Sequence, residues 1–243
     1  MSRQAVIEQL RSAPPKLSVG ILAGDVMDFG ASIKLLEQFG VLLHLDVMDG
    51  RVWPKITAGA PILAGMRTRL LKDVHLLIEQ PEKHIEDFAK AGADVISFSV
   101  EVAAATGNVA ATLDLIGQMK NANDPERGIL RGVSLDPATP VDVLTHVADK
   151  IDVVVLLAVG PDTGKQEFIT ALPEKIAAAR ALNGDVAIFV DGAVTRDNIG
   201  QIAAMGPDGI VTGSAAFAGD PAENIRFMLE QIGRSTGRLS TGG

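Results

Sequence analysis

The stretch DVHLLIEQPEKHIEDFAKAGADVISF, residues 73–98, holds one complete repeat of the pattern on which the fold depends. Two short apolar runs, at residues 73–78 and 94–98, flank an amphipathic segment at residues 81–91. Pro81 can open a helix because its missing N–H would have no partner there, and Gly92 can end one in a left-handed conformation. The stretch therefore predicts a strand, a helix and a second strand parallel to the first.

The same alternation occurs eight times along the chain. Strands are expected at residues 17–22, 41–47, 73–78, 94–98, 128–135, 152–158, 186–190 and 209–212. Helices are expected at residues 31–39, 60–69, 81–91, 109–120, 141–148, 172–182, 196–204 and 221–232. Eight strand–helix units within 243 residues favour an α/β fold of the (β/α)8 TIM-barrel class over an open sheet.

The chain shows no linker, low-complexity stretch or shift in composition. Residues 1–243 are therefore expected to form a single (β/α)8 barrel domain. A short extra helix is expected at residues 2–11, before the first strand, and a frayed tail at residues 234–243. The segments AGAD and MGPD, residues 91–94 and 205–208, predict two equivalent turns between a helix and the next strand.

Composition narrows the class of protein. Hydrophobic residues make up 47% of the chain and aromatic residues 4%, so the core must consist mainly of Val, Ile, Leu and Ala. The absence of cysteine excludes disulfides and thiolate metal sites, and it is compatible with the reducing cytoplasm, the expected location. A net charge of −8 argues against nucleic acid as a partner, and no apolar run is long enough for a membrane span. A small phosphorylated substrate stays possible, because backbone N–H groups and one lysine can bind a phosphate.

Polar side chains fall at or near the ends of three expected strands. His44 and Asp46 are two residues apart, so they share one face of a strand, while His75 and Asp191 come from two other strands. Singly, a strand histidine is more often a hydrogen-bonded core residue, and a strand-end aspartate often caps a helix. Together, at the barrel end where catalytic groups gather, they favour a metal site. Two imidazoles and two carboxylates suit one divalent ion: Zn²⁺, Fe²⁺, Mn²⁺ or Co²⁺.

These segments resemble the ribulose-phosphate 3-epimerase family. The motifs that carry the resemblance are GILAGD, HLDVMDG, DVHLLIEQPE, FAKAGAD, GVSLDPATP, QEFI, VDGAV and GSAAF, in the family's order between residues 19 and 217. The resemblance implies a TIM barrel of the ribulose-phosphate-binding type, an isomerase activity and a homo-oligomer.

The resemblance also implies roles for individual residues. His44, Asp46, His75 and Asp191 match the family's metal ligands, and Asp46 and Asp191 match its acid/base pair. The residues implied to contact the substrate or its phosphate are Gly20, Met48, His75, Asp162, Thr163, Gly164, Lys165, Gly192, Ala193, Gly213 and Ser214.

The activity so implied is epimerisation at C3 of a ketose phosphate, of the D-ribulose 5-phosphate to D-xylulose 5-phosphate type. Two carboxylates would move the proton through an enediolate, which a divalent ion stabilises. The chain departs from the family pattern where Gly20 replaces a serine, Ser99 replaces a histidine and Asp162 enters the phosphate loop. These departures leave open an epimerase acting on a hexulose or tetrulose phosphate, a related aldolase or decarboxylase, or a non-catalytic phosphosugar-binding barrel. The retained ligands and carboxylates favour an enzyme.

Overall fold

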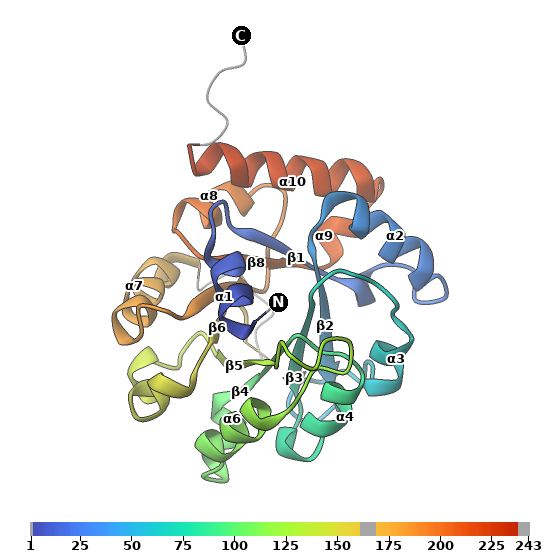
Figure 1. The fold of residues 1–243 in the computed structure, drawn as a ribbon. Helices are drawn as coiled ribbons and strands as arrows, with labels where there is room; N and C mark the ends of the chain where they lie inside the picture. Colours follow the sequence, from blue (N-terminus) through green and yellow to red (C-terminus); the bar gives the residue numbers. More distant parts are fainter. Residues whose placement is uncertain (1, 161–168, 238–243) are drawn as a thin grey trace.

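The computed structural model describes residues 2–160 and 169–237. Its strands form a closed barrel in which all neighbours are parallel and follow chain order from β1 to β8, with β8 pairing back to β1 (Figure 1). The strands are β1 Lys16–Gly20, β2 Leu42–Met48, β3 Lys72–Leu77, β4 Val95–Ser99, β5 Leu130–Leu135, β6 Val153–Leu157, β7 Ala187–Asp191 and β8 Gly209–Thr212. The expected α/β barrel is therefore confirmed, and each expected strand overlaps an observed one.

Helices connect the strands and surround the barrel (Figure 1). The α-helices are α1 Arg3–Arg11, α2 Phe29–Phe39, α3 Ala60–Gly65, α4 Ile85–Lys90, α5 Val100–Ala105, α6 Val109–Gln118, α7 Leu172–Leu182, α8 Ile199–Ala204, α9 Ser214–Phe217 and α10 Pro221–Ser235. The 3₁₀ helices are η1 Ile21–Ala23, η2 Pro81–Lys83, η3 Val141–Lys150 and η4 Ile169–Ala171. The short helices α5 and α9 were not expected from the sequence.

Several expected helices differ in form or extent. Residues 81–91 form the 3₁₀ helix η2 followed by α4, and the helix expected at residues 60–69 ends at Gly65. The segment expected as a helix at residues 141–148 is the 3₁₀ helix η3, whose buried residues Val141, Leu144 and Val147 recur every third position. That spacing suits the three residues per turn of a 3₁₀ helix. The helix expected at residues 196–204 begins only at Ile199, because the Asn198 side chain accepts a hydrogen bond from the Thr195 N–H and holds a turn there.

The two ends of the described chain are helical. Ser2 caps α1 with its side-chain oxygen, so the extra helix expected at residues 2–11 begins one residue later. In Figure 1 α1 lies across the barrel, and its buried Val6, Ile7 and Leu10 pack against the barrel interior. At the other end, α10 runs to Ser235 and so extends two residues into the segment expected as a tail, residues 234–243, of which residues 238–243 lie outside the described ones.

The turns at the amino-terminal end of the barrel repeat one arrangement. Asp94 accepts a hydrogen bond from the backbone N–H of Lys72 at 2.7 Å, and Asp208 accepts one from Ile188 at 2.8 Å. Gly92 and Gly206, which precede them, both have positive φ, as expected for helix ends. The predicted equivalence of the two turns is confirmed. Each aspartate thus links the start of its own strand to the first part of the preceding strand.

Side chains on the strands alternate between two hydrophobic clusters. The larger cluster fills the space between strands and helices, while the second lies inside the barrel and includes Leu42, Val155 and Phe189. Inward-facing polar side chains continue the interior toward the carboxyl-terminal end of the strands, where the candidate site lies. No helix of the described residues combines the length and the apolar character that crossing a membrane would require.

Candidate active site

Strand β2 brings two of the expected site residues to the barrel interior. Leu42 belongs to the interior cluster, so His44 and Asp46, two and four residues further along, face the same way. His44 is buried, whereas the side chain of Asp46 is 33% exposed, so this face of β2 passes from the core to the barrel mouth.

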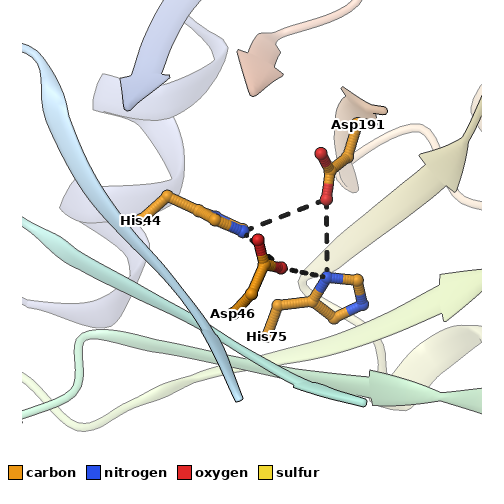
Figure 2. Close-up of side chains that lie close together, drawn as sticks. All are labelled: His44, Asp46, His75 and Asp191. Carbon is orange, nitrogen blue, oxygen red and sulfur yellow. Dashed lines mark hydrogen bonds and ion pairs between the residues drawn. The ribbon is translucent and has the colours of Figure 1, made fainter. Parts of the chain in front are cut away.

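Neighbouring strands supply the other two residues. His75 on β3 pairs with Asp46 in the strand register and is fully buried. Asp191 is the last residue of β7, with a side chain 15% exposed. In Figure 2 the carboxylate of Asp191 points toward both imidazole rings, and that of Asp46 lies between the same rings. The two carboxylates therefore approach one point from different strands.

The four side chains form a compact cluster. His44 Nε2 lies 3.1 Å from Asp46 Oδ1 and 3.9 Å from Asp191 Oδ2. His75 Nδ1 lies 3.4 Å from Asp46 Oδ1 and 3.5 Å from Asp191 Oδ2 (Figure 2). One ligand atom from each residue falls within 4.8 Å of all the others. The structure thus brings together all the residues expected to bind a metal.

Strong electrostatic coupling accompanies this proximity. Burial opposes a charge on His44, but the charges of Asp46 and Asp73 raise the pKa of His44 well above its ordinary value. Burial likewise opposes a charge on His75, but its contacts with Asp191 and Asp46 raise the pKa of His75 to about 9. Burial would raise the pKa of Asp46, yet the charge of His44, its hydrogen bond with Asp46 and the nearby His75 ring hold that pKa well below its ordinary value. The cluster is thus a strong cation-binding environment.

The donor atoms fit a divalent ion. His44 Nδ1 lies 2.8 Å from a carboxylate oxygen of Asp73, so an ionised Asp73 leaves His44 Nε2 as the nitrogen available to the cluster. Both ring nitrogens of His75 are buried without a hydrogen-bond partner among the described residues. In a neutral His75 ring without a proton on Nδ1, the lone pair of that nitrogen faces the carboxylate oxygens of Asp46 and Asp191. A cation between the two carboxylates would accept this lone pair. Nitrogen and carboxylate oxygen are ligands that Zn²⁺, Fe²⁺, Mn²⁺ and Co²⁺ accept.

Several residues expected to contact substrate lie at or just after the carboxyl-terminal ends of neighbouring strands. Gly20 ends β1, and Gly213 and Ser214 follow β8, which pairs with β1. A side chain at Gly20 would come within 3.5 Å of the Gly213 Cα, so these two backbones lie close together. Met48 ends β2 and is half-buried.

The backbone after β7 has an unusual conformation. Gly192 has φ of +98°, and a Cβ there would lie 2.5 Å from a Val159 methyl group, so only glycine fits. Ala193 follows with φ of +53°, a region that non-glycine residues rarely adopt. Strain of this kind gathers at ligand-binding sites. The expected contacts of Asp162, Thr163, Gly164 and Lys165 lie outside the described residues.

Two contacts of the cluster were not expected from the sequence. Asp73 is adjacent to His44 in the β2–β3 register, and Ser18 on β1 donates a hydrogen bond to the same Asp73 oxygen. Asp73 stands two residues before His75, so its inward direction could have been read from the strand alternation. Its pairing with His44 could not, because register is a property of the folded sheet.

Comparison with known proteins agrees with this geometry. The profile of the ribulose-phosphate 3 epimerase family matches residues 16–217. The chain belongs to this family. Ribulose-phosphate 3-epimerase of Bacillus subtilis is 38% identical, covering 83% of this chain and 92% of the relative. Ribulose-phosphate 3-epimerase of Candida glabrata is 34% identical, covering 90% of this chain and 92% of the relative.

Another relative matches over a longer part of the chain. A putative epimerase of Salmonella typhi, LsrE, is 36% identical and covers 99% of this chain and 97% of its own. Among solved structures, a tryptophan synthase α-subunit of Pyrococcus furiosus superposes with a TM-score of 0.61 at 14% identity, covering 92% of this chain and 97% of that one. At this identity the likeness concerns the barrel fold alone.

Proposed function

We propose that this member of the ribulose-phosphate 3-epimerase family is an isomerase that epimerises a ketose phosphate at C3, converting D-ribulose 5-phosphate to D-xylulose 5-phosphate. The observation that carries the proposal is the pair of carboxylates, Asp46 and Asp191, that meet at one cation-binding point from different strands. Inversion of one carbon needs one group to remove a proton and another to supply a proton on the opposite face.

The proton moves between two side chains. Asp46 takes the proton from C3 as its carboxylate, and the electron pair of the broken C–H bond enters an enediolate. Asp191, protonated at the start, then delivers its proton to C3 from the other face, which inverts the centre. In the reverse direction Asp191 is the base and Asp46 the acid. Each turnover leaves the two carboxylates with exchanged protonation states.

His44, Asp46, His75 and Asp191 would hold one divalent ion, which when bound stabilises negative charge on the enediolate oxygens. The ion is Zn²⁺, Fe²⁺, Mn²⁺ or Co²⁺. The buried imidazoles keep their positions on strands, so the carboxylates are oriented before substrate arrives. Orientation of this kind lowers the entropic cost of the reaction.

The substrate phosphate would bind at backbone groups beside the cluster. The consecutive positive φ angles at Gly192 and Ala193, and the close approach of Gly213 to Gly20, support a backbone cradle after β7 and β8. Phosphate commonly binds there in barrels of this fold. Ser214 and the loop residues Asp162, Thr163, Gly164 and Lys165 are proposed to complete the cradle, and Met48 and His75 to line the sugar.

The test is C3 epimerisation of D-ribulose 5-phosphate by the metal-depleted protein, with and without each of the candidate ions. Metal-dependent formation of D-xylulose 5-phosphate is the expected result. Turnover restricted to a hexulose or tetrulose phosphate would refute the pentulose assignment. Bound metal with no exchange of solvent protons into any ketose phosphate would refute catalysis and leave a phosphosugar-binding barrel. We further propose that the protein is a homo-oligomer, which light scattering tests through its mass in solution. We also propose that it is located in the cytoplasm, which cell fractionation tests.

A further inference from the structure

Asp73 is a buried carboxylate that takes no part in the proton transfer proposed above. It lies on β3 with 1% of its surface exposed, inside the barrel and below the metal cluster. One of its oxygens, Oδ2, lies 2.8 Å from His44 Nδ1 and accepts a hydrogen bond from Ser18 Oγ at 3.0 Å. Its other oxygen, Oδ1, has no hydrogen-bond partner among the described residues.

A carboxylate buried at this position lowers the stability of the fold unless other groups compensate its charge. An ionised group buried away from water needs an opposite charge or several hydrogen bonds. Within the described part of the chain, no arginine or lysine forms an ion pair with Asp73, and its only ion-pair partner there is His44. By contrast, the buried Asp152 at the other end of the barrel is paired with Arg131 and Arg3. Among the described residues, His44 is thus the one side chain that can balance the charge of Asp73 as an ion-pair partner.

The hydrogen bond decides which nitrogen of His44 faces the cluster. An ionised carboxylate only accepts, so the proton of a neutral His44 ring must lie on Nδ1, toward Asp73. Nε2 then presents a lone pair toward Asp46 and Asp191, at 3.1 and 3.9 Å. The same ring with its proton on Nε2 would leave Nδ1 and Asp73 as two acceptors in contact.

We propose that Asp73 is a positioning residue for the metal centre: through His44 Nδ1 it holds the ring with Nε2 toward the ion and increases the affinity for a divalent cation. Ser18 orients the Asp73 carboxylate, since its hydroxyl donates to the oxygen that His44 contacts. The inference rests on the proposed function in that it needs a metal ion in this cluster. Second partners of metal-bound histidines commonly act in this way.

His75 provides an internal contrast. Its Nε2 has no partner among the described residues, so no carboxylate selects its orientation from behind as Asp73 does for His44. The strand register explains the difference, because His44 pairs with Asp73 whereas His75 pairs with Ser97. The supporting carboxylate therefore belongs to only one of the two imidazoles.

The first test measures Zn²⁺ affinity by calorimetry with a competing chelator, on the full-length, metal-depleted protein. Asp73→Asn keeps the size of the side chain and removes its charge, and we expect its Kd for Zn²⁺ to rise about tenfold to a hundredfold. Ser18→Ala should raise the Kd a few-fold. Asp152→Asn, which removes a buried carboxylate at the amino-terminal end of the barrel, should leave it unchanged within about twofold.

The outcomes separate this inference from the proposed function. Wild-type protein that binds no Zn²⁺ would overturn the proposed metal dependence and this inference with it. Wild-type protein that binds Zn²⁺, with an Asp73→Asn variant of equal affinity, would overturn only the inference. Equal losses in Asp73→Asn and Asp152→Asn would also overturn it, because they would indicate general damage to the barrel.

A second measurement needs no substitution of Asp73. In the ¹⁵N NMR spectrum of the Zn²⁺-loaded wild-type protein, we expect His44 to carry its proton on Nδ1, shielded from exchange with water. Ser18→Ala should weaken that shielding. A His44 ring that carries its proton on Nε2, or an unchanged Nδ1 proton in Ser18→Ala, would overturn the inference even if Asp73→Asn fails to fold.

Discussion

Replacement of Asp191 by asparagine should separate proton removal from epimerisation. The two carboxylates are nearly equivalent in position, with oxygens 3.4 and 3.5 Å from the same His75 nitrogen. Asparagine has the same shape but cannot carry the transferred proton, so Asp46 stays in place as a base without an acid opposite it. A positioned acid or base contributes about 10²–10⁴-fold. We expect epimerisation to fall about a thousandfold, equivalent to about 4 kcal/mol in activation free energy.

The informative readout is exchange of the C3 hydrogen with solvent. With saturating Zn²⁺ in D₂O, Asp191→Asn should still exchange the C3 hydrogen of one epimer, because Asp46 remains in place as the base. Asp46→Asn should exchange only the other epimer. Proton NMR of both pentulose phosphates measures each rate. The two-carboxylate mechanism is refuted if both variants exchange the same epimer, or if Asp191→Asn still epimerises within tenfold of the wild-type rate.

Other predictions concern the ion, the pH and the packing of the barrel. Chelation should abolish turnover, and Zn²⁺ at a hundred times its Kd should add about 2.7 kcal/mol to the free energy of unfolding, measured by urea titration. In the metal-free protein the pKa of His75 is raised from 6.5 to about 9. The stability that the protonated ring contributes should be complete below pH 6.5 and lost as the pH rises through about 9. Urea titrations across this range measure the loss, and an unchanged free energy of unfolding would contradict the prediction. Gly132→Ala would place a Cβ 2.7 Å from the Ser97 Cβ and should destabilise the fold by about 1–3 kcal/mol, whereas Gly184→Ala, with nothing within 4 Å, should change it by less than about 0.5 kcal/mol in the same urea titration.

The barrel could be predicted from the sequence because its signals are local. Apolar runs, amphipathic segments and the glycines before Asp94 and Asp208 each mark a boundary, and the structure bears out those turns. The misjudged elements depend on contacts that no local pattern shows. The side chain of Asn198 holds a turn that delays α8, and the spacing of Val141, Leu144 and Val147 fits a 3₁₀ helix as well as an α-helix.

The cluster itself was predictable for a similar reason. His44 and Asp46 share a strand face, and parallel strands bring His75 and Asp191 to the same end of the barrel, so alternation and strand ends were sufficient to bring them together. The role of Asp73 was not predictable. Its contact with His44 depends on which residues of β2 and β3 are paired, and a shift of one residue would turn it away from the interior.

Charge balance explains why this geometry can exist both with and without an ion. Three carboxylates, Asp46, Asp73 and Asp191, surround the two imidazoles. One divalent cation with neutral imidazoles gives the same total charge as two protonated imidazoles, and the raised pKa values of His44 and His75 favour the second state when no ion is bound. Metal binding then exchanges two protons for one ion in an already formed cluster. The affinity should therefore increase with pH at least until His75 loses its proton near pH 9, and the backbone need not move when the ion enters.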